Sequence, residues 1–251
     1  MTFSLTPASL CAVVLDIEGT TTPIDFVYEV LFPFARTHVE DYLRQSLGSE
    51  ELLLDLAKLR AEYEADVAQK LAPPPWPDGP PDAQVGSIVA YFHWLMDRDR
   101  KSTGLKSLQG KIWRQGYLNG ELKGRVFPDV PPALERWRRK DLSISIFSSG
   151  SVLAQKLLFA NSDAGDLTKF LGGYFDTTMG PKTAEASYRH IAAALRLQPL
   201  QGLFISDEST ELDAAKSAGM QTALCVRPGN RPQPTGHGHV TIKDFSEVVG
   251  P

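Results

Sequence analysis

The sequence has few cysteines and no long apolar run, and each shortage excludes a class of protein. Only two cysteines occur among 251 residues, Cys11 and Cys225, and two isolated cysteines provide neither a disulfide framework nor the paired spacing of a zinc site. No apolar run reaches the roughly 18 residues that a membrane-spanning helix needs. The opening MTFSLTPASL lacks the basic flank and apolar stretch of a signal peptide. We therefore expect a cytoplasmic protein that does not contact a membrane.

Basic charge is also scarce. The formal net charge is −4, and the sequence has no basic stripe of the kind that binds nucleic acid. The two densest basic runs, 98–101 and 136–140, fall at expected helix ends, where cations offset the helix dipole and face water. With 42% hydrophobic residues, the chain can bury a full core as one large domain or two unequal ones. We expect a monomer that binds a small molecule and no nucleic acid.

A long helical stretch interrupts the chain after its first strand. From about residue 26 to residue 118 the apolar residues recur at helical spacing, as Leu52, Leu56 and Leu59 do, and no convincing strand lies between them. Residues 72–82 hold six prolines in eleven positions and are predicted to form a loop. We expect residues 20–125 to form an inserted all-helical cap, and residues 1–19 and 126–251 to form the catalytic core.

The rest of the chain alternates strands with helices. The apolar run CAVVL at 11–15 is typical of a buried parallel strand. Further strand candidates, with predicted helices between them, lie at 142–147, 174–177, 203–206 and 222–226. Such alternation indicates a parallel sheet with helices on both faces. The expected fold class is α/β, with a Rossmann-like parallel sheet and the helical cap inserted into it.

Residues that can do chemistry follow the expected strands. Ligand sites in open parallel sheets lie beyond the carboxyl ends of the strands. The polar residues at those ends are Asp16, Glu18, Ser148, Ser149, Gly150, Asp207 and Glu208, and Lys182 lies in a Gly-Pro turn before a helix. Four separate segments are therefore expected to bring acids, hydroxyls and one ammonium to the same edge of the sheet.

The two acids after the first strand indicate a divalent cation. At positions i and i+2 of an extended chain, Asp16 and Glu18 point the same way, and neighbouring carboxylates resist joint ionisation unless a positive charge relieves them. Mg²⁺ binds through one or two carboxylates together with a substrate phosphate, and Asp207 can supply a further oxygen. We therefore predict one Mg²⁺ per chain, with Lys182 beside it to neutralise a phosphoryl group.

These groups are sufficient for phosphoryl transfer. Ser148, Ser149 and the backbone before a helix can hold an anion. Asp16 can attack phosphorus, and Glu18 can serve as general acid for the leaving oxygen and then as general base for water. The catalytic residues are therefore predicted to be Asp16, Glu18 and Lys182.

Each of these residues also has a simpler interpretation. Asp16 alone can stabilise a turn, Ser148 and Ser149 can cap the next helix, and Lys182 can be a surface lysine. The conjunction of all four segments favours the catalytic interpretation. His237 and His239 can chelate a metal, although a flexible loop is the interpretation we favour for the Gly-rich text around them.

The motifs resemble those of a known superfamily. DIEGTTTP at Asp16, SSGS at Ser148, an isolated lysine before a helix and SDESTELDAA at Ser206 are similar to the motifs of the haloacid dehalogenase-like phosphohydrolases. Most relatives carry Asp at the position of Glu18, and DIEGTTTPI resembles the branch of enolase-phosphatases of methionine salvage. FVYEVLFPFA, LKSLQGKIWRQGY, YFDTTMGPKTAEASYRHIA and CVRPGN extend the resemblance over nearly the whole chain.

The resemblance implies a magnesium enzyme that enolises 2,3-diketo-5-methylthiopentyl-1-phosphate and then dephosphorylates it to the acireductone 1,2-dihydroxy-3-keto-5-methylthiopentene. It implies Asp16 as nucleophile and metal ligand, Glu18 as metal ligand through its carbonyl and as acid or base, and Asp207 as the remaining ligand. Ser148, Ser149 and Lys182 would hold the substrate. Glu211 stands where many members place another acid, and we expect it to act indirectly, behind the ligands.

Three rival functions use some of the same residues. A signalling receiver domain also phosphorylates an aspartate, but it is much shorter and has no cap. A dehalogenase would direct Asp16 at carbon without a metal, so Glu18 and Asp207 count against it. A binding protein without activity would be expected to lack Asp16, Lys182 or Asp207, and all three are present.

Overall fold

The computed structural model describes residues 10–234 and 236–248. The chain divides into two compact units, one of Met1–Tyr28 with Lys123–Pro251 and the other of Glu29–Leu122. We call the first the sheet unit and the second the helical unit. The boundaries expected from the sequence lay after Gly19 and Arg125, and that division stays a prediction.

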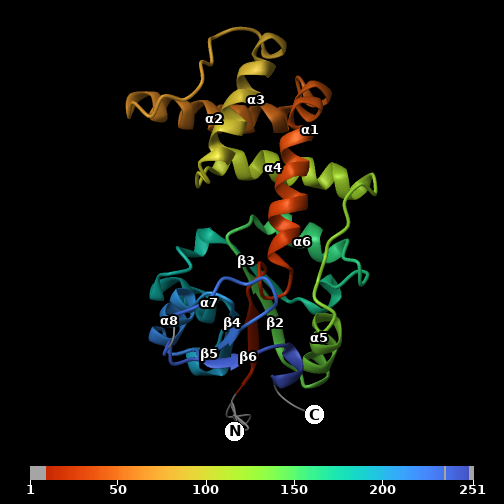
Figure 1. The fold of residues 1–251 in the computed structure, drawn as a ribbon, viewed down its shortest axis with the longest axis vertical. Helices are drawn as coiled ribbons and strands as arrows, with labels where there is room; N and C mark the ends of the chain where they lie inside the picture. Colours follow the sequence, from red (N-terminus) through yellow and green to blue (C-terminus); the bar gives the residue numbers. More distant parts are fainter. Residues whose placement is uncertain (1–9, 235, 249–251) are drawn as a thin grey trace. The chain divides into compact units, whose positions relative to one another are not determined.

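In the described residues the sheet unit is built on six parallel strands in the order β3-β2-β1-β4-β5-β6 (Figure 1). The strands are β1 Ala12–Leu15, β2 Ser143–Phe147, β3 Gly173–Phe175, β4 Gly202–Ser206, β5 Gln221–Cys225 and β6 Val240–Ile242. β1 lies between β2 and β4 and is completely buried, which explains why its sequence is a continuous apolar run. The expected α/β class with a parallel sheet is confirmed.

The helices that accompany the strands are α5 Val130–Arg139, α6 Val152–Ala160, α7 Glu185–Ala194 and α8 Ser209–Ser217. Figure 1 shows α7 and α8 on one side of the sheet and α5 on the other. Under α7 and α8, Val14, Phe147 and Phe204 from three neighbouring strands pack with Tyr188 and Leu212. Close-packed side chains of this kind make the sheet a rigid support for groups at its edge.

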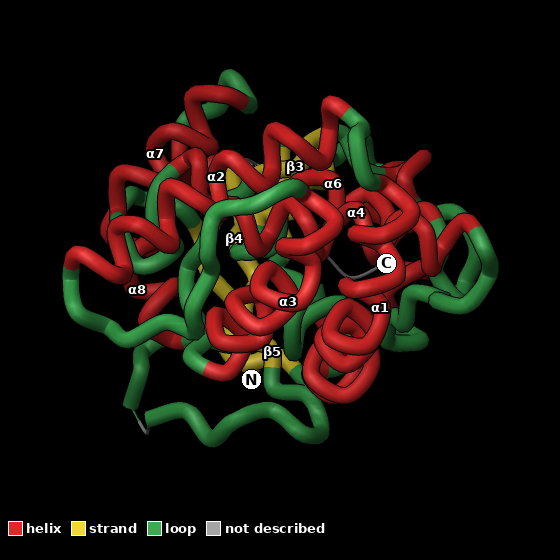
Figure 2. The backbone as a smooth tube through the Cα atoms, turned by 90° about the horizontal axis from the view of Figure 1, so that it is seen from above, coloured by secondary structure: helices red, strands yellow, loops and turns green. Residues whose placement is uncertain are grey.

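The helical unit contains α1 Phe32–Ser46, α2 Glu50–Ala68, α3 Pro81–Asp97 and α4 Thr103–Leu118. These elements are red in Figure 2, and a π-helical segment, Phe26–Leu31, precedes them. The hydroxyls of Ser49 and Ser102 accept hydrogen bonds from backbone N–H groups in the first turns of α2 and α4, which fixes where each helix begins. Inside the unit, Lys111 of α4 forms an ion pair with Asp55 of α2, and both side chains are buried.

The proline-rich stretch behaves as expected. It has no regular structure up to Pro80, and α3 begins at Pro81, because the first turn of a helix tolerates proline. In the described part of the chain no helix is long and apolar enough to cross a membrane.

One strand was not expected from the sequence. β6 follows the Gly-rich segment that was predicted to be a flexible loop, and it pairs with β5. Just before it, His239 is buried; its Nδ1 lies 3.0 Å from the Thr222 hydroxyl, and its Nε2 lies 3.0 Å from Asp213. These contacts make His239 part of the packing of the sheet unit. The Gly and Pro residues before β6 favoured a loop, so the strand that follows them was not predicted.

Candidate active site

The turn after β1 fixes the first candidate residue, Asp16. Its backbone N–H donates to the carbonyl of Ile205 in β4 at 3.0 Å, and the residue is 3% exposed. The N–H groups of Thr20, Thr21 and Thr22 all converge on the carbonyl of Ile17. The Thr21 hydroxyl donates to the Asp16 carbonyl at 3.0 Å. Asp16 therefore lies at the buried edge of the sheet, on backbone that is hydrogen-bonded on both sides.

Lys182 links Asp16 to Glu211. The Lys182 Nζ lies 2.5 Å from Asp16 Oδ1 and 2.6 Å from Glu211 Oε2. Glu211, in the first turn of α8, also accepts a hydrogen bond of 2.9 Å from the hydroxyl of Ser206 at the end of β4. One ammonium from the segment before α7 is thus shared by two largely buried carboxylates from β1 and α8.

The charges around Lys182 keep it protonated. Burial alone would lower its pKa, but the carboxylates of Asp16, Glu211 and Glu18 outweigh burial and raise the pKa above its ordinary value. A permanently charged ammonium beside Asp16 can neutralise an anion that arrives there. This behaviour contradicts the simpler interpretation of Lys182 as a surface lysine, since its side chain is only 9% exposed.

Asp207 follows β4 and completes the acidic surroundings. Burial, followed by the charges of Asp16 and Glu211, raises the pKa of Asp207 to about 7. Its carboxylate packs closely against the turn after β1: a Cβ added to Gly19 would lie 2.3 Å from Asp207 Oδ2. Gly19 also has a φ of +72°, so both its conformation and its surroundings require glycine. Asp207 therefore lies directly against the turn that carries Glu18.

Glu18 lies in that turn. It is partly buried, and its backbone forms an isolated bridge with Thr22. Its charge is one of those that raise the pKa of Lys182, so the side chain shares the electrostatic environment of the Asp16 cluster.

Ser148 and Ser149 lie at the same edge of the sheet as Asp16. Ile146 of β2 is level with Leu15 of β1, so the residues after β2 emerge beside those after β1. Ser148 is buried, and its hydroxyl accepts a hydrogen bond from the N–H of Gly150 at 3.1 Å. Within the described residues, no hydrogen bond or ion pair joins either serine to Asp16 or Lys182. The N-cap of α6 is Ser151, so neither Ser148 nor Ser149 performs the capping role that was the alternative interpretation.

The acidic residues fit a hard cation better than a thiolate or imidazole metal site. The charges of Asp16, Glu211 and Glu18 raise the pKa of Lys182, and the pKa of Asp207 is raised first by burial and then by the charges of Asp16 and Glu211. Oxygen ligands of this kind suit Mg²⁺. Across residues 10–234 and 236–248, however, no three His, Cys, Asp or Glu side chains are grouped closely enough to hold a metal ion. The metal ligands Asp16, Glu18 and Asp207 therefore stay a prediction.

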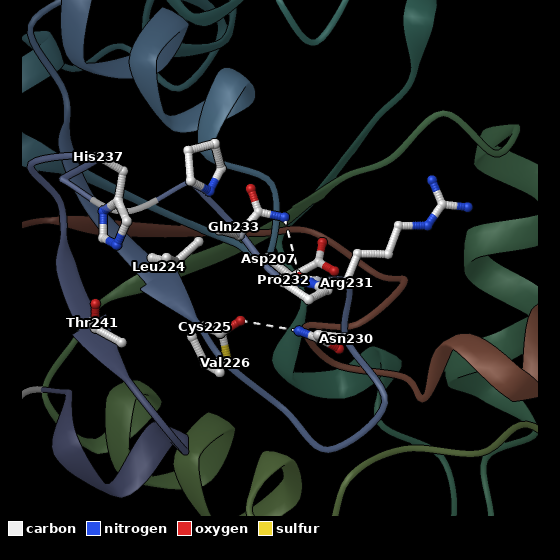
Figure 3. A pocket seen from close by; sticks show the side chains of 11 residues that line it. Asp207, Leu224, Cys225, Val226, Asn230, Arg231, Pro232, Gln233, His237 and Thr241 are labelled. Atoms are coloured by element: carbon white, nitrogen blue, oxygen red, sulfur yellow. Dashed lines mark hydrogen bonds between the residues drawn. The ribbon is translucent and has the colours of Figure 1, made fainter.

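A pocket of about 240 Å³ opens beside Asp207, between the ends of β4 and β5 and Thr241 of β6 (Figure 3). Its lining includes Cys225, Asn230 and Gln233. The segment CVRPGN is part of the sequence resemblance, but no role was predicted for Arg227 or Asn230. Glu211 was predicted to act indirectly, and its ion pair with Lys182 is the contact through which it can do so.

Comparison with known proteins identifies the class to which the chain belongs. Residues 11–219 match the family model described as haloacid dehalogenase-like hydrolase. The chain is 53% identical to Enolase-phosphatase E1 of Synechococcus elongatus, covering 96% of this chain and 99% of the relative. It is 43% identical to Enolase-phosphatase E1 of Pseudomonas aeruginosa, covering 95% of this chain and 97% of the relative.

A solved structure supports the same family assignment. The crystal structure of the UTR4 protein of Saccharomyces cerevisiae superposes with a TM-score of 0.74 at 33% identity, covering 94% of this chain and 98% of that chain. The chain therefore belongs to the haloacid dehalogenase-like hydrolases and, within them, to the family of the enolase-phosphatases E1. The resemblance found in the motifs is confirmed.

Proposed function

We propose that the protein is a magnesium-dependent enolase-phosphatase of methionine salvage. Its substrate would be 2,3-diketo-5-methylthiopentyl-1-phosphate, and its product the acireductone 1,2-dihydroxy-3-keto-5-methylthiopentene. The observation that carries the proposal is the buried ion pair of Asp16 with Lys182, at 2.5 Å, beside Asp207. Family membership supplies the substrate class.

Asp16 is the nucleophile of the proposed reaction. The Lys182 ammonium contacts one of its oxygens, which leaves the other oxygen to approach phosphorus. A bond forms between that oxygen and phosphorus while the bond from phosphorus to the leaving enol oxygen breaks. Glu18 donates the proton that the leaving oxygen takes up. The result is an aspartyl phosphate and the free enol.

Hydrolysis of the aspartyl phosphate reverses these roles. Glu18, now a carboxylate, removes a proton from water as the water oxygen attacks phosphorus. The bond between phosphorus and the Asp16 oxygen breaks, which releases inorganic phosphate and restores the carboxylate. Glu18 is also our candidate for the base of the preceding enolisation.

Charge neutralisation around the phosphoryl group depends on several groups. Lys182 and the hydroxyls of Ser148 and Ser149 would bind its oxygens, and Glu211 orients Lys182 through their ion pair. One Mg²⁺ per chain would be held by the carboxylates of Asp16 and Asp207 and the carbonyl of Glu18. When bound, the ion offsets the negative charge of the phosphoryl group and of the acids around it.

The remaining parts of the proposal concern the protein as a whole. We propose a cytoplasmic monomer whose partner is this small phosphate ester, and we propose that the helical insert is its cap. Size-exclusion chromatography with light scattering tests the monomer.

Turnover of the diketone phosphate with Mg²⁺ tests the function directly. We expect ultraviolet absorbance of the enol to rise together with the release of phosphate. Asp16→Asn is expected to abolish phosphate release while the protein stays folded. Asp141→Asn is the matched control, because Asp141 is exposed and precedes β2, at the opposite end of the strand from the site. Full turnover by Asp16→Asn would refute the nucleophile assignment.

A further inference from the structure

The segment after β5 holds the turn that carries Glu18. We call Arg227–Asn230 the clamp segment. We propose that Arg227 and Asn230 are positioning residues for the reaction, because their side chains fix two carbonyl oxygens of the turn after β1. The inference rests on the proposed function, since it concerns how Asp16, Glu18 and Asp207 are kept in place for that chemistry.

Asn230 ties the turn to the end of β5. Its Nδ2 donates to the carbonyl of Gly19 at 3.0 Å and to the carbonyl of Cys225 at 3.1 Å; the second bond is drawn in Figure 3. A Cβ added to Gly19 would lie 2.9 Å from Asn230 Oδ1 and 2.3 Å from Asp207 Oδ2. The amide of Asn230 and the carboxylate of Asp207 therefore pack against the same point of the turn.

Arg227 holds the next carbonyl. It is 6% exposed, and its Nε and Nη2 lie 3.3 Å and 3.1 Å from the carbonyl oxygen of Thr20. The guanidinium is itself fixed by a bidentate ion pair with Asp129, with both distances 2.8 Å. It also lies 4.4 Å from the ring centre of Phe127 and 4.9 Å from that of Phe245. Because these contacts fix the planar guanidinium, it is a rigid hydrogen-bond donor.

The hydrogen bonds of the turn show what the clamp segment supplies. The carbonyl of Thr21 accepts from the N–H of Phe127, and the carbonyl of Thr22 accepts from the N–H of Gly19. The carbonyls of Gly19 and Thr20 accept instead from the side chains of Asn230 and Arg227. Because buried carbonyls need partners, losing either side chain leaves a polar group unsatisfied and favours movement of the turn.

Movement of the turn would disturb catalysis. Glu18 lies between Asp16 and Gly19, so a shift at Gly19 changes the position of Glu18 and the packing of Asp207. Displacements of about 1 Å in positioned catalytic groups can reduce rates about 100-fold. Groups that orient metal ligands typically affect metal affinity or activity by about 10- to 100-fold.

A matched pair of asparagine variants tests the inference. Asn230→Ala removes the amide that donates to the carbonyls of Gly19 and Cys225. Asn161→Ala is the control, because the Asn161 amide also donates to a backbone carbonyl in the sheet unit, that of Leu157 at 2.8 Å, far in sequence from the turn. Three quantities are measured in each: hydrogen exchange of the Gly19–Thr22 amides, Mg²⁺ affinity by calorimetry, and kcat and KM.

We expect Asn230→Ala to speed exchange of those amides at least about 10-fold and to weaken Mg²⁺ binding and lower kcat by about 10- to 100-fold. KM should change little, because the clamp segment is not proposed to touch the substrate. Arg227→Lys should show a smaller loss than Arg227→Met, since lysine keeps the charge opposite Asp129 but lacks the fork. Asn161→Ala should match the wild type in all three quantities.

Unchanged kcat and Mg²⁺ affinity in folded Asn230→Ala would overturn the inference, whether or not amide exchange increases. Equal losses in Asn161→Ala would also overturn it, because the effect would then reflect general stability. If the wild type fails to release phosphate, the proposed function fails, while amide exchange and the Mg²⁺ titration still decide whether the clamp segment holds the turn and its ion.

Discussion

Replacing Gly19 by alanine should combine two penalties that the structure allows us to separate. The φ of +72° costs a residue with a Cβ about 1–2 kcal/mol. The new methyl group would also lie 2.3 Å from Asp207 Oδ2, and overpacking of this kind typically costs about 1–3 kcal/mol. We therefore expect Gly19→Ala to lower the free energy of unfolding by about 2–5 kcal/mol.

Gly165→Ala is the matched control for the first penalty. Gly165 is in the sheet unit with a φ of +87°, and no atom lies within 4 Å of its added Cβ. It should lose only the conformational contribution, about 1–2 kcal/mol. The difference between the two variants then measures the crowding against Asp207.

Urea unfolding followed by circular dichroism measures the free energies, and a thermal scan should show a decrease in Tm of about 2–4 °C for each kcal/mol lost. Because the methyl group displaces Asp207, phosphate release by Gly19→Ala should also fall, by about 100-fold if the carboxylate moves by about 1 Å. If Gly19→Ala proved as stable as Gly165→Ala and as active as the wild type, the close packing of the turn against Asp207 would be refuted.

Two further predictions concern protons. The pKa of Asp207 is raised to about 7 in the folded protein. The stability that the protonated carboxyl contributes is therefore fully present below the pKa of the unfolded chain, near 4, and is lost as pH rises through about 7. Without Mg²⁺, Asp207→Asn should gain stability relative to the wild type between pH 4 and pH 8 in urea titrations. A constant difference between the two proteins would contradict the raised pKa. Glu18→Gln should lower kcat by about 100- to 10,000-fold and remove one limb of its pH profile, and a normal rate and profile would mean that another group moves the proton.

The sequence was most informative about local features. Continuous apolar runs predicted β1 and β4, and the position of Asp16 after β1 follows from the rule that sites lie at the carboxyl ends of parallel strands. Lys182 was recognised as a candidate because it stands in a Gly-Pro turn before a helix. These inferences need only neighbouring residues and a known topology.

Contacts between distant residues could not be predicted in the same way. A single sequence does not show that Glu211 pairs with Lys182, or that Arg227 reaches the carbonyl of Thr20. Each contact depends on the orientation of a side chain within the assembled sheet. β6 was missed for a related reason, because Gly and Pro residues precede it and its pairing with β5 cannot be seen in its own sequence.

The hydrogen bonds from Arg227 to Thr20 have a consequence for the order in which the protein acquires activity. Donor and acceptor are 207 residues apart, so the turn beside Asp16 cannot be completed during translation until β5 and the residues after it have been synthesised. A nascent chain can assemble β1, β2 and much of the sheet earlier, but we expect its nucleophile to remain in a loosely held loop. Catalytic competence should therefore appear only after Arg227 and the residues around it have been synthesised.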